Sequence, residues 1–330
     1  MKADSRKLPA DLPRRAFLSR RRLLVWYDSH RRDLPWRHDR DPYHVWLSEI
    51  MLQQTRVTAV LGHYRRFLQR FPTVEKLAAA RESSVLAVWS GLGYYRRARM
   101  LHTAAKKIVR ELAGKFPHSV EGLRALPGIG RYTAAAIASI AFGEPAAVVD
   151  GNVERALQRL LGENLRAEPM WQAAQELLSP ERPGDFNQAM MELGATVCLP
   201  RAPMCLVCPV FDFCATRGEG LKPRKSPPQN KREVHYALHH RNGSVFLVKR
   251  KKDASLMPDM WELPEIPRGN GVGESCLTLR HSITVTDYVV RVLQGPAPNG
   301  SDGQWVPKGR IPTLPLTGLA RKILRAAQVI

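Results

Sequence analysis

Four closely spaced cysteines constrain the fold of this chain more than any other feature of its sequence. No histidine lies between them, and Pro200 and Pro209 stiffen the segment. Four thiols at such spacing fit a tetrahedral zinc ion or a [4Fe-4S] cluster, and their crowding indicates metal ligation in a reducing compartment rather than disulfides. The chain must therefore fold so that these thiols converge. The cysteines are Cys198, Cys205, Cys208 and Cys214.

Length and charge narrow the class of protein. A chain of 330 residues exceeds what one hydrophobic core usually serves, which predicts two domains. Its 51 Lys and Arg against 30 Asp and Glu leave a net charge of +21, which attracts phosphate backbones of any sequence. A basic, solvated surface without a nucleic-acid partner is the alternative, so the motifs must decide between the two.

The sequence shows no sign of export or of membrane insertion. Its basic N-terminal segment has no apolar run before Phe17, which argues against a secretory signal. It also has no apolar run of the roughly eighteen residues that a membrane-spanning helix requires. We therefore expect an intracellular, cytoplasmic protein that does not bind membranes.

Hydrophobic periodicity divides the chain into three segments. Residues 14–216 show the apolar spacing of helices and predict an all-α domain. Residues 217–232, rich in Lys, Arg, Pro and Gly, predict a basic linker able to lie along phosphates. Residues 233–330 contain short β-branched runs, an Asn242-Gly243 turn and a final helical pattern, and predict an α+β domain. Breaks between the helices are expected at 71–72, 91–93, 116–117, 127–128 and 143–145.

Two further motifs lie within the helical segment. Gly128 and Gly130 form a Gly-x-Gly turn ahead of a helix rich in small residues. Such a turn lets backbone N–H groups approach a phosphate, and the positive end of the following helix dipole adds to the attraction. An ordinary connection between helices is the alternative. Asp150 then begins the next predicted helix, which Asn152 could cap, and a plain N-cap is the alternative for Asp150.

The segment Trp46–Thr55, with Arg37 and Tyr94, resembles the MutY family of adenine DNA glycosylases. The cysteine spacing is similar to that of the wider helix-hairpin-helix glycosylase superfamily, where this pattern holds a [4Fe-4S] cluster. The resemblance covers residues 32–214. It implies an all-α helix-hairpin-helix glycosylase domain in which Cys198, Cys205, Cys208 and Cys214 hold a [4Fe-4S] cluster, with a structural zinc ion as the alternative.

The resemblance implies catalytic roles for three residues. The family's catalytic acid occupies the position of Glu49, whereas endonuclease III enzymes lack this glutamate and carry a nucleophilic lysine where this chain has Tyr132. The resemblance implies that Glu49 protonates adenine N7 and later activates water, and that Asp150 stabilises or transiently captures the sugar cation. Tyr132 helps to position this chemistry. For Glu49 the alternative is a glutamate in the first turn of a helix, which complements the helix dipole.

The resemblance also implies which residues bind DNA. Arg37 and Glu192 are expected around an adenine flipped out of the duplex. Gln54 and Tyr94 are expected in the vacated stack, and core packing is the alternative for Tyr94. The remaining expected contacts are Asn152 for the substrate and Gly128 and Gly130 for the DNA backbone.

The second domain resembles the Nudix-like domain by which this family senses 8-oxoguanine, through Trp261–Pro264 and the strands around it. The chain has no Gly-x5-Glu-x7-Arg-Glu-x2-Glu-Glu run, so the carboxylates that would bind Mg²⁺ for Nudix hydrolysis are missing. Where the family usually offers Phe-Ser-His to the lesion, residues 279–282 read Leu-Arg-His-Ser. His281 is the candidate lesion contact, and a strand histidine facing solvent is the alternative.

Together these motifs predict a monofunctional glycosylase that excises adenine opposite 8-oxoguanine or guanine from double-stranded DNA in base excision repair. Two alternatives remain: another mismatch glycosylase of the superfamily, for instance one acting on thymine, and a non-catalytic iron–sulfur protein that binds DNA. The joint presence of Glu49, Tyr132 and Asp150 argues against the second. We expect a nucleoid-associated monomer, with room for transient contacts with replication or repair proteins.

Overall fold

The computed structural model describes residues 12–219, 229–267, 275–283 and 285–330, and gives residues 12–16 by their backbone alone. Most of the predicted linker at 217–232 lies outside the described residues. Contacts within the chain form two compact units, Met1–Gln53 with Arg110–Arg224 and Gln54–Val109 with Lys225–Ile330. Residues 54–109 are thus grouped with the C-terminal strands. The domain limits expected from the sequence, 14–216 and 233–330, stay predictions.

Helices occupy the described chain up to the cysteines, as the apolar periodicity predicts, and every expected break falls between two helices. Side chains cap several helix starts, as Thr73 and Ser119 do. Gly143 and Gly162 end two helices in the left-handed conformation, at φ 72° and 73°. None of the helices described is both long and apolar enough to cross a membrane. The α-helices are α1 (Leu12–His30), α2 (Pro42–Leu52), α3 (Val57–Arg70), α4 (Val74–Ala78), α5 (Glu82–Trp89), α6 (Tyr95–Leu112), α7 (Val120–Arg124), α8 (Arg131–Phe142), α9 (Gly151–Leu161), α10 (Glu168–Leu177), α11 (Pro183–Thr196) and α12 (Gly318–Ala326).

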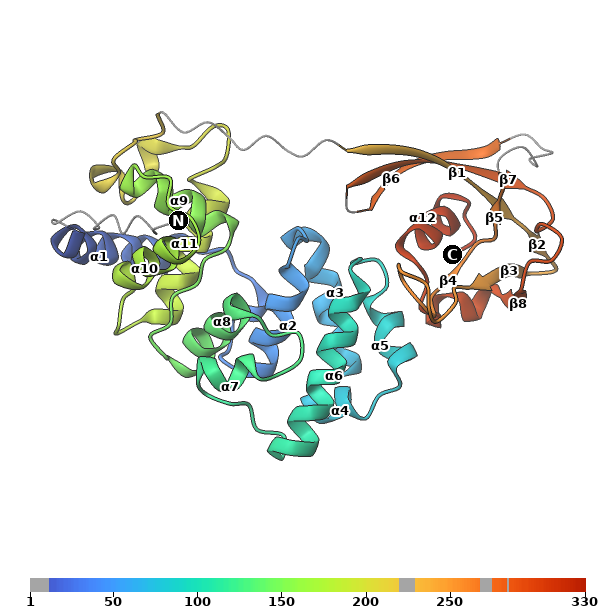
Figure 1. The fold of residues 1–330 in the computed structure, drawn as a ribbon, viewed down its shortest axis with the longest axis horizontal. Helices are drawn as coiled ribbons and strands as arrows, with labels where there is room; N and C mark the ends of the chain where they lie inside the picture. Colours follow the sequence, from blue (N-terminus) through green and yellow to red (C-terminus); the bar gives the residue numbers. More distant parts are fainter. Residues whose placement is uncertain (1–11, 220–228, 268–274, 284) are drawn as a thin grey trace, which may run out of the picture. The chain divides into compact units, whose positions relative to one another are not determined.

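The first unit packs α1, α9, α10 and α11 around one apolar core. Helix α8 is buried along most of its length, and α2 and α11 pack against it, with α2 and α8 side by side in Figure 1. The small side chains of α8 permit this close packing. Gly184 shows how close it is, because a Cβ there would lie 2.6 Å from the carbonyl oxygen of Ser139. Short 3-10 helices complete the unit: η1 (Pro35–Arg37), η2 (Cys205–Val207) and η3 (Phe211–Phe213).

The second unit contains α3, α4, α5, most of α6, two β-sheets and α12. One of the sheets is mixed and the other is antiparallel. One sheet has the order β5-β1-β7-β6, with β1 and β7 parallel. The other has the order β2-β3-β4, with β8 also paired to β3. Helix α12 contacts β4 and β6, and Figure 1 shows it next to the strands. The strands are β1 (Asn230–Leu238), β2 (His240–Arg241), β3 (Ser244–Lys249), β4 (Trp261–Glu262), β5 (Glu265–Ile266), β6 (Ser275–Ile283), β7 (Thr286–Gln294) and β8 (Gly303–Pro307), with η4 (Lys308–Thr313) after them.

Local signals account for parts of this second unit. Strands β2 and β3 pair across Asn242 and Gly243, whose φ values of 48° and 69° are those a two-residue hairpin turn requires, so the predicted turn is confirmed. Tertiary contacts supply the rest. The hydroxyls of Ser90 and Tyr95 both donate to the carbonyl oxygen of Leu316, at 2.8 and 2.9 Å, and so tie the end of α5 and the start of α6 to the chain before α12.

Candidate active site

Glu49 lies in the last turn of α2, so the alternative of a first-turn glutamate is wrong. At this end of the helix the dipole disfavours a carboxylate. The residue is only 6% exposed. Burial raises the pKa of Glu49 to about 7 and the nearby charge of Asp150 also raises it, whereas the hydrogen bond from Tyr132 acts in the opposite direction. Near neutral pH this carboxyl can therefore hold a proton or release it.

Tyr132 stands in the first turn of α8 and faces Glu49. Its hydroxyl lies 2.7 Å from Oε2 of Glu49 and 3.2 Å from Sδ of Met191. Burial, then the charges of Glu49 and Asp150, raise the pKa of Tyr132 well above its ordinary value. The phenol therefore stays neutral and can donate to the Glu49 carboxylate. Met191 did not emerge from the sequence, because a methionine at helical spacing indicates core packing.

The turn before Tyr132 is the hairpin of a helix-hairpin-helix formed by α7 and α8. Gly128 has a φ of 76°, a conformation that glycine adopts without strain. Gly130 is the N-cap of α8, and no described atom lies within 4 Å of the place where its Cβ would be. The backbone of this turn is therefore free of side-chain cover at Gly130, as close approach to a phosphate requires.

Asp150 is the N-cap of α9, so the capping role considered for it from the sequence is confirmed. Its Oδ1 accepts from the backbone N–H groups of Asn152 and Val153 at 2.9 and 2.7 Å, and its Oδ2 accepts from the side-chain amide of Asn152 at 3.1 Å. Burial raises the pKa of Asp150 while these hydrogen bonds act to lower it. Capping does not remove the residue from the site, because its charge acts on both Glu49 and Tyr132.

Arg155 extends this arrangement toward the cysteines. Its Nη2 donates to Oδ1 of Asn152 at 2.9 Å and to the carbonyl oxygen of Gly194 at 2.7 Å, and its Nε donates to the carbonyl oxygen of Cys198 at 2.8 Å. A side chain at Gly194 would disturb this arrangement, because a Cβ there would lie 2.6 Å from Cβ of Asn152. One run of hydrogen bonds therefore joins Asp150 to the cysteine segment.

Arg37 and Glu192 lie together, with Nη2 of Arg37 2.9 Å from Oε2 of Glu192. Arg32, which no motif in the sequence singles out, also binds Glu192. Its Nε and Nη2 donate to the two carboxylate oxygens at 2.7 and 2.9 Å, and its backbone N–H donates to Oε1 at 3.1 Å. Burial alone would raise the pKa of Glu192, but the hydrogen bonds from Arg32 and Arg37 lower it to about 2. Glu192 therefore stays ionised, whereas Glu49 titrates near neutral pH.

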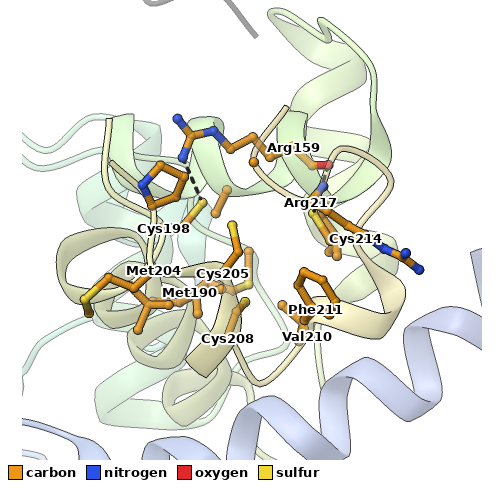
Figure 2. A pocket seen from close by; sticks show the side chains of 16 residues that line it. Arg159, Met190, Cys198, Met204, Cys205, Cys208, Val210, Phe211, Cys214 and Arg217 are labelled. Carbon is orange, nitrogen blue, oxygen red and sulfur yellow. Dashed lines mark hydrogen bonds between the residues drawn. The ribbon is translucent and has the colours of Figure 1, made fainter. Parts of the chain in front are cut away.

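The four clustered cysteines line one pocket, and Figure 2 shows their side chains around it. Nη1 of Arg159 donates to Sγ of Cys198 at 3.3 Å, the dashed line in Figure 2, and the backbone N–H of Arg217 donates to Sγ of Cys214 at 3.4 Å. Gly218 completes the wall, because a Cβ there would lie 2.8 Å from Sγ of Cys205. The thiols therefore converge, as the spacing predicts.

Burial and mutual charge affect how readily these thiols ionise. Among the described residues, no three His, Cys, Asp or Glu side chains are placed to hold one metal ion between them. Burial raises the pKa of Cys208 to about 11, and burial followed by the charges of Cys214 and Cys198 raises that of Cys205. Thiols in this state need the positive charge of a metal centre to become thiolate ligands.

Three predicted DNA contacts lie in the second unit. Tyr94 is 45% exposed, so core packing is wrong for this residue. Tyr94 and Gln54 have positive φ values of 48° and 54°. His281 lies on β6, where alternate residues, His281 among them, are partly buried. Burial, and then the charge of Lys322, lower its pKa.

The site combines a buried glutamate, a hairpin between two helices and an aspartate N-cap. A family model described as "HhH-GPD superfamily base excision DNA repair protein" matches residues 47–180. Among solved structures, a thermostable thymine-DNA glycosylase is similar with a TM-score of 0.59 and 30% identity, covering 62% of this chain and 97% of that one. A non-covalent endonuclease III–DNA complex has a TM-score of 0.53 at 22% identity, covering 62% and 95%, which shows the shared fold alone.

Curated relatives narrow the class. The chain is 32% identical to an adenine DNA glycosylase of Schizosaccharomyces pombe over 320 residues, covering 76% of this chain and 69% of that protein. It is 33% identical to one of Buchnera aphidicola over 262 residues, covering 76% and 74%. The chain therefore belongs to the adenine DNA glycosylase family. It is 50% identical to the human adenine DNA glycosylase over 210 residues, which cover 59% of this chain and 38% of the human protein. The chain thus spans well under half of that relative's length.

Proposed function

We propose that this protein is a monofunctional DNA glycosylase that excises adenine opposite 8-oxoguanine or guanine in double-stranded DNA, within base excision repair. The observation that carries the proposal is the buried Glu49, hydrogen-bonded to Tyr132 and with a pKa of about 7. Cleaving an N-glycosidic bond requires protonation of a poor leaving group, and a carboxyl with this pKa can supply that proton at neutral pH.

The proposed reaction is hydrolysis of the bond between C1′ of the sugar and N9 of adenine. Glu49 gives its proton to N7, the bonding electron pair leaves with the base, and a sugar cation forms at C1′. The carboxylate of Asp150 stabilises or transiently captures this cation. Glu49, now a carboxylate, then takes a proton from the attacking water. Tyr132 orients Glu49 throughout and cannot form the Schiff base of a lyase, so the product is an intact abasic strand.

Recognition of the flipped base is assigned to the arginines around Glu192. Each carboxylate oxygen of Glu192 already accepts two hydrogen bonds, from Arg32 and Arg37, so it has no free lone pair. Its role in this proposal is to orient the guanidiniums. Their remaining N–H groups would donate to ring nitrogens, of which adenine offers more as acceptors than thymine does. Asn152 completes the substrate contacts, and Gly128 and Gly130 bind the DNA backbone through N–H groups.

We propose that the four cysteines hold a [4Fe-4S] cluster. The four thiols surround one pocket, and their spacing resembles the cluster-binding pattern of the helix-hairpin-helix superfamily, which favours a cluster over a zinc ion. When bound, the cluster would supply the bonds that fix residues 198–214 in one conformation. Through Arg155, the same segment supports Asn152 and Asp150.

The C-terminal strands and α12 are proposed to form a Nudix-like domain that senses 8-oxoguanine, with His281 as its lesion contact. Gln54 and Tyr94 are proposed to enter the vacated stack. On this proposal the protein acts on nucleoid DNA as a monomer, since one protein envelops one lesion.

A second candidate, thymine excision, is favoured by the similarity to a thymine-DNA glycosylase. One experiment separates the two: base release under single-turnover conditions from duplexes with A opposite 8-oxoguanine, A opposite G, and T opposite G. We expect free adenine from the first two duplexes, and strand breaks only after alkali. Release of thymine would establish the second candidate. Tight binding without release of any base would indicate a DNA-binding protein, and breaks before alkali would overturn the monofunctional assignment.

A further inference from the structure

Two turns in the second unit hold bulky residues in a conformation that normally belongs to glycine. Gln54 follows α2 with a φ of 54°, and Tyr94 precedes α6 with a φ of 48°. Neither is a residue type that favours the left-handed region, and such backbone strain persists only where surrounding contacts enforce it. Tyr94 also exposes 45% of its surface. The contacts that enforce these two turns are therefore of functional interest.

Arg97, near the start of α6, contacts both turns. Its guanidinium carbon lies over the ring of Tyr94, 5.1 Å from the centroid, and over the ring of Trp89 at 5.7 Å. Its Nη2 donates to Oγ1 of Thr55, the residue after Gln54, at 3.3 Å. One partly buried side chain thus touches the ring of Tyr94 and the turn that contains Gln54.

The surroundings of Arg97 hold this side chain in place. Its backbone N–H donates to the carbonyl oxygen of Tyr94 at 2.8 Å, and the indole N–H of Trp89 donates to the carbonyl oxygen of Gly93 at 3.1 Å. The turn is thereby closed on both sides of Tyr94. Burial lowers the pKa of Arg97 to about 10, so the group remains a cation at neutral pH and keeps its attraction to the two aromatic faces. A lysine has the charge but not the flat group that stacks on a ring.

We propose that Arg97 is a positioning residue that fixes the Tyr94 ring and the Gln54–Thr55 turn in the arrangement with which they enter the DNA stack. The inference rests on the proposed function, in which these two residues replace the flipped adenine. The contacts that a side chain makes between base pairs offset the free-energy cost of unstacking them. A Tyr94 ring that is already ordered loses less conformational entropy on entry, so the base leaves the stack more readily. Arg97 therefore acts on base extrusion and not on cleavage of the glycosidic bond.

The test compares Arg97→Lys with Arg96→Lys, a matched change at an exposed neighbour. The duplex carries 2-aminopurine opposite 8-oxoguanine, because the fluorescence of this adenine analogue rises when it leaves the stack. Arg97→Lys is expected to reduce this rise and, on a second duplex with adenine opposite 8-oxoguanine, to slow single-turnover adenine release by about tenfold. Arg96→Lys is expected to leave both unchanged. Thr55→Val, which removes the hydroxyl at the other end, is expected to shift both in the same direction by a smaller factor.

A double-mutant cycle separates positioning from general destabilisation. In a Tyr94→Ala background, Arg97→Lys is expected to slow release by less than about twofold, because the ring that it positions is gone. An equal loss in both backgrounds, or an Arg97→Lys protein with unchanged fluorescence and rate, would overturn the inference. If Arg97→Lys does not fold, the cycle is run with Thr55→Val. Failure of the unmodified protein to release adenine is a different outcome, which overturns the proposed function and the inference with it.

Discussion

Replacing Glu49 by glutamine should stabilise the protein at alkaline pH while it removes activity. The folded protein holds the Glu49 proton up to a pH of about 7, whereas the ordinary pKa of the group is 4.5. Between these values the folded state binds more protons than the unfolded state, so the free energy of unfolding falls as pH rises. Above pH 7 the ionised, buried carboxylate lowers the stability of the folded state by about 3 kcal/mol.

Glutamine has nearly the same shape as glutamate and does not ionise, so the unfolding free energy of the variant does not fall as pH rises through 7 for this reason. We expect Glu49→Gln and the unmodified protein to have similar unfolding free energies at pH 4.5, and the variant to gain about 3 kcal/mol by pH 8.5. Urea unfolding followed by helical circular dichroism, with a pH series, measures the difference. Glu176→Gln, at an exposed position, is the control and should change stability by less than about 0.5 kcal/mol at every pH. A difference that does not grow with pH would refute the reasoning.

Three further changes test other parts of the site. Glu192→Gln leaves the guanidiniums of Arg32 and Arg37 without their carboxylate and should destabilise the protein by about 3 kcal/mol at pH 7. Because the pKa of Glu192 is lowered to about 2, this difference in unfolding free energy, measured by urea titration, should shrink as pH falls from 4.5 toward 2. Tyr132→Phe removes the hydrogen bond that lowers the pKa of Glu49, so the alkaline limb of the pH–rate profile should move to higher pH. Gly194→Ala forces a Cβ against Asn152 and should cost about 2 kcal/mol in thermal unfolding and reduce adenine release; a fully stable, active variant would show that this contact gives way freely.

Features that repeat along the chain were open to prediction. Apolar residues at helical spacing, broken by glycine and proline, predict the helices and every break between them, because burial of one face is a local property of the sequence. The convergence of the four cysteines was also predictable, because they lie within seventeen residues of one another in the sequence. The pair Asp41-Pro42 is also a local signal, because it marks the start of a helix. Asp41 caps α2 and Pro42 begins it, so Glu49 cannot lie in the first turn.

Features that depend on tertiary contact were not open to prediction. Arg32 and Arg155 are two among 51 Lys and Arg residues, and only the folded chain shows which of them meets a buried carboxylate or the cysteine segment. The grouping of α3 to α6 with the C-terminal strands has a similar origin. It depends on contacts such as those of Ser90 and Tyr95 with Leu316, which join positions far apart in the sequence.

The pH dependence of adenine release tests most directly whether Glu49 is the catalytic acid. The assay uses a duplex with A opposite 8-oxoguanine, a single turnover, and enzyme below saturation, so that the profile reports groups of the free enzyme. We predict a rate that falls as pH rises through about 7, and for Glu49→Gln a rate at least about 10³-fold lower without this limb. A profile of the unmodified protein without a limb near pH 7, or a Glu49→Gln variant that still releases adenine, would contradict the account.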